Sequence, residues 1–67
     1  MAIRERLAAN IVKLRKDRGW SQEELADRAG LHRTYVSGVE RCARNPTITV
    51  VEKFAKALEV DLGQLLG

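Results

Sequence analysis

Residues 22–41 carry the pattern that most restricts what this chain can fold into. Apolar residues at helical spacing predict two short helices here, and Gly30 between them supplies the left-handed backbone at which helices commonly end. One side of each helix is apolar, and the two sides are expected to pack together: Leu25, Ala26 and Ala29 from the first, Val36 and Val39 from the second. The stretch therefore predicts a helix-turn-helix.

The opposite side of the second helix is polar. On a helical wheel it turns these residues outward: Arg33, Thr34, Ser37, Gly38 and Arg41. In a helix-turn-helix the second helix enters the major groove of DNA, where guanidinium and hydroxyl groups bond to base edges. Double-stranded DNA is therefore the first partner that the sequence indicates.

The apolar spacing elsewhere predicts three further helices, so the expected fold is a single all-α domain of five helices over residues 1–67. The first helix is expected to end at Gly19, and Trp20 after it to pack on the core. Ser21 and Glu24 then predict a capping box, in which the serine caps an amide of the first turn and the glutamate returns the bond.

The expected boundaries are approximate. The first helix spans about residues 2–18, the second reaches about residue 28, and the third spans about residues 32–41. Residues 42–46 form an irregular connector, because Pro46 disfavours helix at the residue before it. Caps are expected at the last two helices: Thr47 or Thr49 for the fourth, and Asp61 with Gln64, as a capping box, for the fifth.

Composition argues against several other classes of protein. One cysteine allows no intrachain disulfide, and the chain lacks the Cys/His spacing of a zinc site, so neither metal nor cofactor is expected. No apolar run is long enough to span a membrane and no charged-then-apolar leader precedes the first helix, so we expect a cytoplasmic protein. One histidine and one cysteine leave no nucleophile–base set, which argues against an enzyme. The net charge of +3 is modest support for a polyanionic partner.

Short motifs in a fixed order extend over nearly the whole chain. They are residues 18–26 (RGWSQEELA), Gly30-Leu31, Val36-Ser37, Glu40-Arg41, Asn45-Pro46 and residues 55–58 (AKAL). Together they resemble the lambda-repressor-like helix-turn-helix domains of phage repressors and Cro proteins. Residues 33–41, followed by Arg44-Asn45, look like the controller proteins of restriction–modification systems, which are small dimeric regulators.

This resemblance implies a sequence-specific transcriptional regulator that controls a restriction–modification operon and its own gene, and that binds a pseudo-palindromic operator as a homodimer. Prophage repressors and antitoxin-type regulators share most of the residues and are the nearest alternatives. A protein-interaction module on the same fold is an alternative of another class, but an interaction face would more often carry apolar anchors. Many relatives have glycine where this chain has Cys42 and Glu59. Since left-handed backbone costs a non-glycine residue roughly 1 kcal/mol, either the helix ends differ or some stability is given up.

Five residues are candidate base contacts: Arg33, Thr34, Ser37, Tyr35 and His32. Arg33 is the first choice, because its guanidinium matches two acceptors of guanine, a pairing worth roughly 1–3 kcal/mol of discrimination. Tyr35 is either a DNA contact, which the resemblance favours, or a partly buried ring. Gly38 either allows the helix backbone to approach the groove closely or is a neutral substitution.

Four residues are expected to contact phosphates: Gln22, Arg41, Arg44 and Asn45. Gln22 lies in the first turn of its helix, where free amides and the helix dipole favour an anion. The other three lie at the end of the recognition helix or just after it and would hold the second strand. Such contacts predict binding that weakens steeply with salt.

Two further expectations concern structure. The resemblance places an interhelical ion pair between Arg15 and Glu40, which is either buried or a pair of surface charges. The apolar residues left over after the core is assigned are Val60, Leu62, Leu65 and Leu66. We expect them to form a twofold dimer interface; the alternative is that they complete the core of the monomer.

Overall fold

Five α-helices and no strands make up residues 2–67, the part of the chain that this computed structural model describes. The helices are α1 (Ile3–Asp17), α2 (Gln22–Ala29), α3 (Arg33–Glu40), α4 (Ile48–Leu58) and α5 (Leu62–Leu66). The all-α fold and the order of its helices are as predicted. The first and third helices are one residue shorter at each end than expected, a difference that helix ends commonly show.

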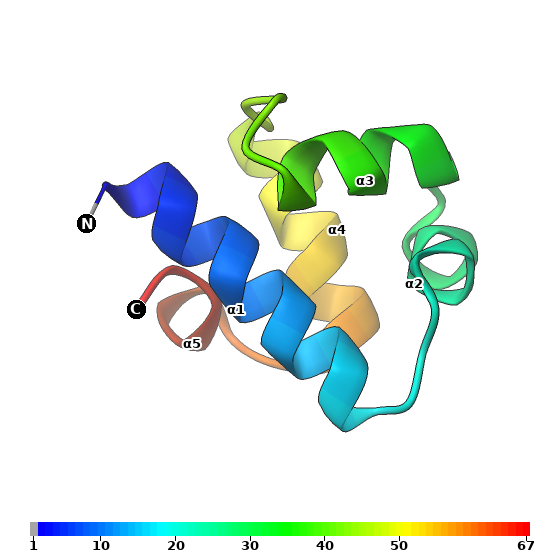
Figure 1. The fold of residues 1–67 in the computed structure, drawn as a ribbon. Coiled ribbons are helices and arrows are strands. Elements are labelled where there is room, and N and C mark those ends of the chain that lie inside the picture. Colours follow the sequence, from blue (N-terminus) through cyan, green and yellow to red (C-terminus); the bar gives the residue numbers. More distant parts are fainter. Residues whose placement is uncertain (1) are drawn as a thin grey trace.

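The helices surround one apolar core (Figure 1). α1 and α4 cross the middle of the molecule, α2 and α3 lie at one side of them, and α5 packs beside α1. Every helix contributes to the core, and the bulkiest residues with essentially no exposed surface are Phe54, Ile11, Leu25, Leu58, Leu65, Val36 and Val39. The apolar seam predicted between α2 and α3 is present, since its five residues are all buried.

The burial of Leu65 corrects one expectation. Its side chain is 0% exposed and belongs to the core of the monomer, so it offers nothing to a dimer interface. α5 is held in this position by Asn10 of α1, whose side-chain amide donates to the backbone carbonyl of Leu65 at 2.8 Å. For this residue the alternative of completing the monomer core is correct.

Side-chain caps begin three of the helices. Ser21 accepts a hydrogen bond from the amide of Glu24 at 3.0 Å, and Thr47, rather than Thr49, accepts one from Val50 at 3.3 Å. Asp61 forms the predicted capping box with the residue three positions later. The second half of the box expected at α2 is absent, because the Glu24 carboxylate instead binds Arg28, one turn along the helix, at 2.7 Å.

Helices α1 to α4 all end in the same way. A residue with left-handed φ follows each helix, and two amides return to carbonyls of the last turn, which is the pattern of a Schellman motif. After α3, for example, the amides of Cys42 and Ala43 donate to the carbonyls of Val39 and Gly38 at 3.0 and 2.8 Å. The left-handed residues and their φ values are Gly19 (71°), Gly30 (70°), Cys42 (59°) and Glu59 (58°).

Two of these left-handed positions lack glycine, so the Schellman geometry is retained at the expense of strain at Cys42 and Glu59. Replacing Cys42 by glycine should raise the free energy of unfolding by about 0.5–1 kcal/mol, because relief of the left-handed strain exceeds the added freedom of glycine in the unfolded chain. Urea unfolding measures the change, provided that the slope of the free energy of unfolding against urea concentration is the same in both proteins. Cys42→Ala is the matched control, since it removes the thiol and keeps the strain. A glycine variant no more stable than the alanine variant would contradict this account.

Candidate nucleic-acid interface

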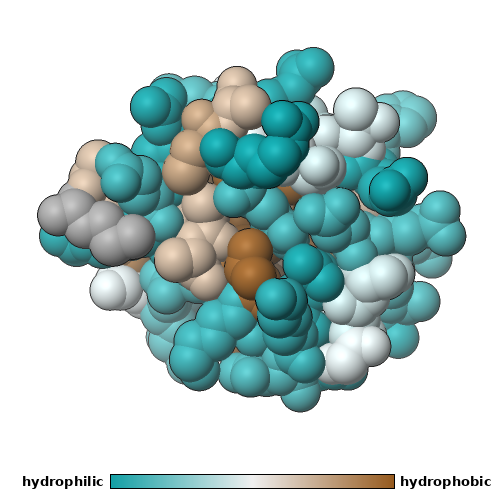
Figure 2. All heavy atoms as spheres, viewed as in Figure 1, coloured by the Kyte–Doolittle hydropathy of each residue, from teal (hydrophilic) through white to brown (hydrophobic). Residues whose placement is uncertain are grey.

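The surface of α3 is polar, as expected for a recognition helix. Arg33, Thr34 and Arg41 are exposed, and Ser37 between them is half-buried. His32 is exposed as well, but it precedes the helix as its N-cap residue and makes no capping bond with its side chain. The hydropathy surface shows mainly hydrophilic and near-neutral residues over α3, while more hydrophobic residues form an interrupted band that crosses α1 (Figure 2).

The arginines at this surface are free of carboxylates. Within residues 2–67, Arg33, Arg41 and Arg44 form none of the four ion pairs found. Three arginines elsewhere behave differently, since Arg15, Arg18 and Arg28 each bind a glutamate. Within the described part of the chain, these three positive charges are therefore left without an ion-pair partner, which favours attraction of a polyanion.

Tyr35 is the partly buried ring that was one of its two alternatives, and its contact with DNA stays a prediction. Its ring packs partly against the hydrophobic core and is half-buried. The guanidinium carbon of Arg44 lies 5.5 Å from the ring centroid, within the range of a cation–π contact. Tyr35 therefore joins the core to the edge of the polar surface.

Gly38 is buried, and this corrects its placement on the outward side of α3. A Cβ atom at this position would lie 2.8 Å from Cγ of Arg44, so that side chain covers the glycine. The covering residue comes from the connector after α3, which a helical wheel does not represent.

The predicted phosphate contacts fall into two groups. Arg41, Arg44 and Asn45 are exposed and line an open hollow of about 420 Å³ beside α3. Gln22 is half-buried, and its amide nitrogen donates to Oε1 of Glu40 at 2.9 Å. Because its other polar atom is an acceptor, a phosphate at Gln22 would be bound by the remaining amide hydrogen or by free backbone amides at the start of α2.

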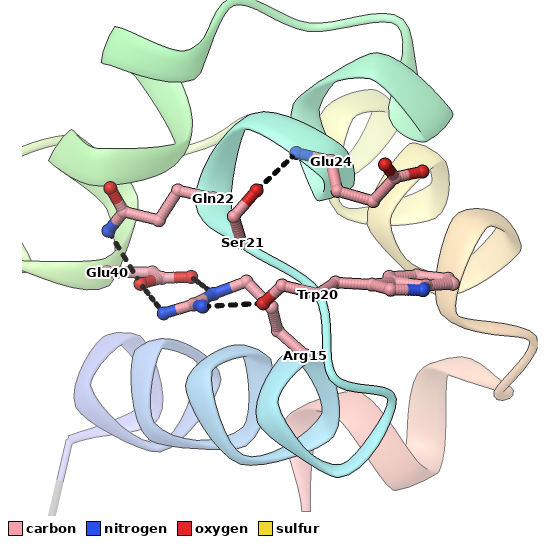
Figure 3. Close-up of polar contacts among 6 residues, drawn as sticks. All are labelled: Arg15, Trp20, Ser21, Gln22, Glu24 and Glu40. Atoms are coloured by element: carbon pink, nitrogen blue, oxygen red, sulfur yellow. Dashed lines mark hydrogen bonds and ion pairs between the residues drawn. The ribbon is translucent and has the colours of Figure 1, made fainter.

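The ion pair expected between Arg15 and Glu40 is present, and its side chains are largely, though not fully, buried. Two nitrogens of the guanidinium donate to the two carboxylate oxygens at 2.8 and 3.0 Å, and the third donates to the carbonyl of Trp20 at 2.9 Å (Figure 3). The side chains are 12% and 5% exposed, respectively. With Gln22 also bonded to Glu40, this network connects α1, the start of α2 and the end of α3.

A second cluster was not foreseen from the sequence. Trp20 packs partly against the core, as expected, but its ring also lies within cation–π range of two guanidinium groups, those of Arg18 at 5.3 Å and Arg28 at 4.3 Å from its centroid. Arg18 extends further, to the carboxylate of Glu59 and the carbonyl of Leu58. The cluster thereby ties the α1–α2 turn to the end of α4.

The remaining residues of the predicted dimer surface lie in the connector between α4 and α5 and on α5. Val60, Leu62 and Leu66 are half-buried and pack on the edge of the core. Val60 and Leu62 line one hollow beside α4, and Leu66 lines another with Ile3 and Ile48. Ile3 and Ile48 are the large hydrophobic residues found exposed within the described chain, at 62% and 61%.

None of the helices within residues 2–67 combines the length and the apolar character that a membrane span requires. Nor do these residues bring together three or more His, Cys, Asp or Glu side chains in a group that could hold a metal ion.

Comparison with known proteins gives clear relatives. A family profile described as Helix-turn-helix matches residues 11–65. A hypothetical transcription factor of Neisseria meningitidis serogroup B is 52% identical over 64 residues, which cover 96% of this chain and 60% of that protein. Control protein C.SmaI of Serratia marcescens is 46% identical over 66 residues, covering 98% of this chain and 79% of the relative.

Solved structures agree with these matches. The crystal structure of the hypothetical transcription factor NHTF from Neisseria has a TM-score of 0.95 at 50% identity, over 98% of this chain and 76% of that one. The restriction–modification controller protein C.Esp1396I has been solved as a tetramer with its natural 35 base-pair operator. Its structure has a TM-score of 0.89 at 38% identity, over 98% of this chain and 91% of that one.

The five-helix fold and the polar face of α3 define a helix-turn-helix DNA-binding domain. The chain belongs to the helix-turn-helix family of transcriptional regulators. It spans only 60% of the length of the Neisseria relative but most of the length of C.SmaI.

The buried ion pair yields a stability prediction. Glu40→Gln should lower the free energy of unfolding by about 3–5 kcal/mol, because it leaves the Arg15 charge buried without a counter-ion. Replacing both residues, as Arg15→Met with Glu40→Leu, should be less damaging than the single change. Urea unfolding in a stabilising osmolyte would compare the variants.

The exposed pair between Lys13 and Asp17, 3.3 Å apart with side chains 73% and 60% exposed, provides the control. Lys13→Ala should change stability by no more than about 0.5 kcal/mol. Equal effects of Glu40→Gln and Lys13→Ala would show that burial of the Arg15–Glu40 pair contributes nothing.

Proposed function

We propose that this chain is a sequence-specific regulator of transcription that controls a restriction–modification operon, including its own gene, by binding a pseudo-palindromic operator as a homodimer. The observation that carries the proposal is the solvent face of α3, where Arg33, Thr34 and Arg41 are exposed and the arginines lack carboxylate partners in the described chain. Acting on bacterial DNA would place the protein in the cytoplasm.

The proposal of a restriction–modification operon rests on relatives. C.SmaI is a control protein, and C.Esp1396I is a restriction–modification controller that has been solved on its operator. Prophage repressors and antitoxin-type regulators would use the same chemistry on other operators. A methyltransferase or endonuclease gene beside this one would favour the controller role over theirs.

The residues that we propose to contact DNA divide by position. Arg33 and Thr34 begin α3 and are exposed, so they are placed to meet base edges, with Ser37, Tyr35 and His32 at the margins. Arg41, Arg44 and Asn45 lie at the other end of α3, where they would bind phosphates. The start of α2, at Gln22, would bind a phosphate from the opposite side.

Selection from a random duplex pool tests specific binding. The protein should enrich one pseudo-palindromic motif, since two copies of α3 would read half-sites about one DNA turn apart. Arg33→Ala should weaken the preference at one position of each half-site, by roughly 1–3 kcal/mol of discrimination. Lys13→Ala removes one exposed charge from α1 and should leave the motif unchanged.

Two results would count against the proposal. If the wild-type protein enriched no motif, the claim of a specific regulator would be lost. If Arg33→Ala enriched the same motif with the same preferences, Arg33 would have no role in base recognition.

The dimer surface that we propose contains Val60, Leu62 and Leu66, extended by the exposed residues Ile3 and Ile48. An 8-residue recognition helix reaches only a few base pairs, so a second copy is needed for a specific site. Exposed isoleucines beside the half-buried Leu66 are the kind of apolar surface that a second copy would cover.

Sedimentation of the free protein tests this surface. The wild-type chain should be a dimer at micromolar concentration, whereas Ile48→Glu should be a monomer with an unchanged helical spectrum, because Ile48 is 61% exposed and contributes little to the fold. Ala9→Glu adds the same charge at an exposed position of α1 and should remain dimeric. A monomeric wild type, or a dimeric Ile48→Glu, would refute the interface.

A further inference from the structure

Gly38 and Arg44 are in contact although they belong to different segments. Gly38 lies inside α3, whereas Arg44 follows it in the connector to α4. A Cβ atom on Gly38 would be 2.8 Å from Cγ of Arg44, closer than real side chains pack, and 3.3 Å from Cδ, which is an unusually tight contact. The aliphatic part of Arg44 therefore crosses α3 in the space that the missing side chain leaves.

The backbone brings Arg44 to this point. The carbonyl of Gly38 accepts two hydrogen bonds from the connector, from the amides of Ala43 at 2.8 Å and Arg44 at 3.1 Å. These bonds belong to the Schellman turn at Cys42, which folds the chain back over the end of α3. The hydrogen bonds of the main chain thus fix where the Arg44 side chain begins, independently of the contacts that this side chain makes.

The end of the Arg44 side chain is held as well. Its guanidinium carbon lies 5.5 Å from the centroid of Tyr35, which is itself packed partly against the core. Its middle is held at Gly38, so the side chain has contacts along its length and yet carries no ion pair within residues 2–67. Arg44 is exposed and lines the hollow beside α3 together with Arg41 and Asn45.

We propose that Gly38 is a positioning residue for DNA binding: by lacking a side chain it forms, with Tyr35, a seat that holds Arg44 ready to bind a phosphate of the DNA backbone. The inference rests on the proposed function and deepens it. A long side chain that is ordered before binding loses less conformational entropy on binding. A guanidinium held in this way donates charge-assisted hydrogen bonds to phosphate oxygens.

A double-mutant cycle on the selected operator tests the inference. Arg44→Ala should weaken binding about tenfold or more and lower the salt dependence by roughly one released ion per protomer. Gly38→Ala should reproduce much of both effects although it removes no charge, because its Cβ displaces Arg44. Combined with Arg44→Ala, it should add almost nothing.

Stability separates positioning from damage to the fold. Alanine is a better helix former than glycine, and the atoms that must move belong to a flexible side chain. Gly38→Ala should therefore unfold at the same urea concentration as the wild type or a higher one. Lys13→Ala, which removes a charge from an exposed site on α1, should keep wild-type affinity within about twofold.

Nuclear magnetic resonance of the free protein gives a readout that does not involve DNA. The Cδ protons of Arg44 should show a ring-current shift from Tyr35, which disappears in Tyr35→Leu and is reduced in Gly38→Ala. If the ring-current shift were unchanged in Gly38→Ala, the claim that Gly38 helps to hold Arg44 against Tyr35 would be refuted.

The outcomes on DNA are distinguishable from failure of the proposed function. Specific binding by the wild type with full affinity in Gly38→Ala would overturn the positioning role alone. Additive losses in the double variant would also overturn it, because they would show that Gly38 acts independently of Arg44. Absence of any specific binding by the wild type would overturn the proposed function, and the positioning role with it.

Discussion

The buried ion pair between Arg15 and Glu40 is the interaction on which the recognition helix depends. α3 has only eight residues and is too short to be stable alone, so its orientation must come from its neighbours. Its inner side contributes Val36 and Val39 to the core, and its last residue is fixed to α1 by the guanidinium. A carboxylate that is 5% exposed cannot change partners easily, so the end of α3 is held where the connector begins.

Arginines serve two purposes in this structure: some hold the helices together, and others form part of the polar surface at α3. Arg15 and Arg18 bind glutamates and carbonyls of other segments and so fix the helices relative to one another, whereas Arg28 binds Glu24 within α2. Arginines on and after α3 have no such partners in the described chain, and their charge is directed to solvent. Residues of one chemical type thus serve two purposes, and what separates them is whether a carboxylate lies within reach. Net charge alone, at +3, does not reveal this separation.

Local signals predicted most of the fold, and long-range contacts account for what was missed. Apolar periodicity located the helices, and the seam between α2 and α3 followed from side-chain spacing within a short stretch. The burial of Leu65 depends on Asn10, 55 residues earlier, and the burial of Gly38 depends on a side chain beyond the end of its helix. Glu24 had two local partners to choose from, and propensity could not decide between a cap and Arg28. At the candidate site, the residue types could be read from the sequence. Which side chains are held in place, and by which neighbours, could not.

The positions of the tryptophan and the tyrosine have an experimental consequence. The chain has one tryptophan and one tyrosine, and they occupy different environments. Trp20 contacts two arginines where α1 meets α2, whereas Tyr35 lies beside Arg44 at the edge of the polar face. Tryptophan fluorescence should follow the separation of the helices, and tyrosine absorption should follow events at the surface of α3. The protein therefore contains two intrinsic optical probes, one for folding and one for its ligand, and requires no label to distinguish them.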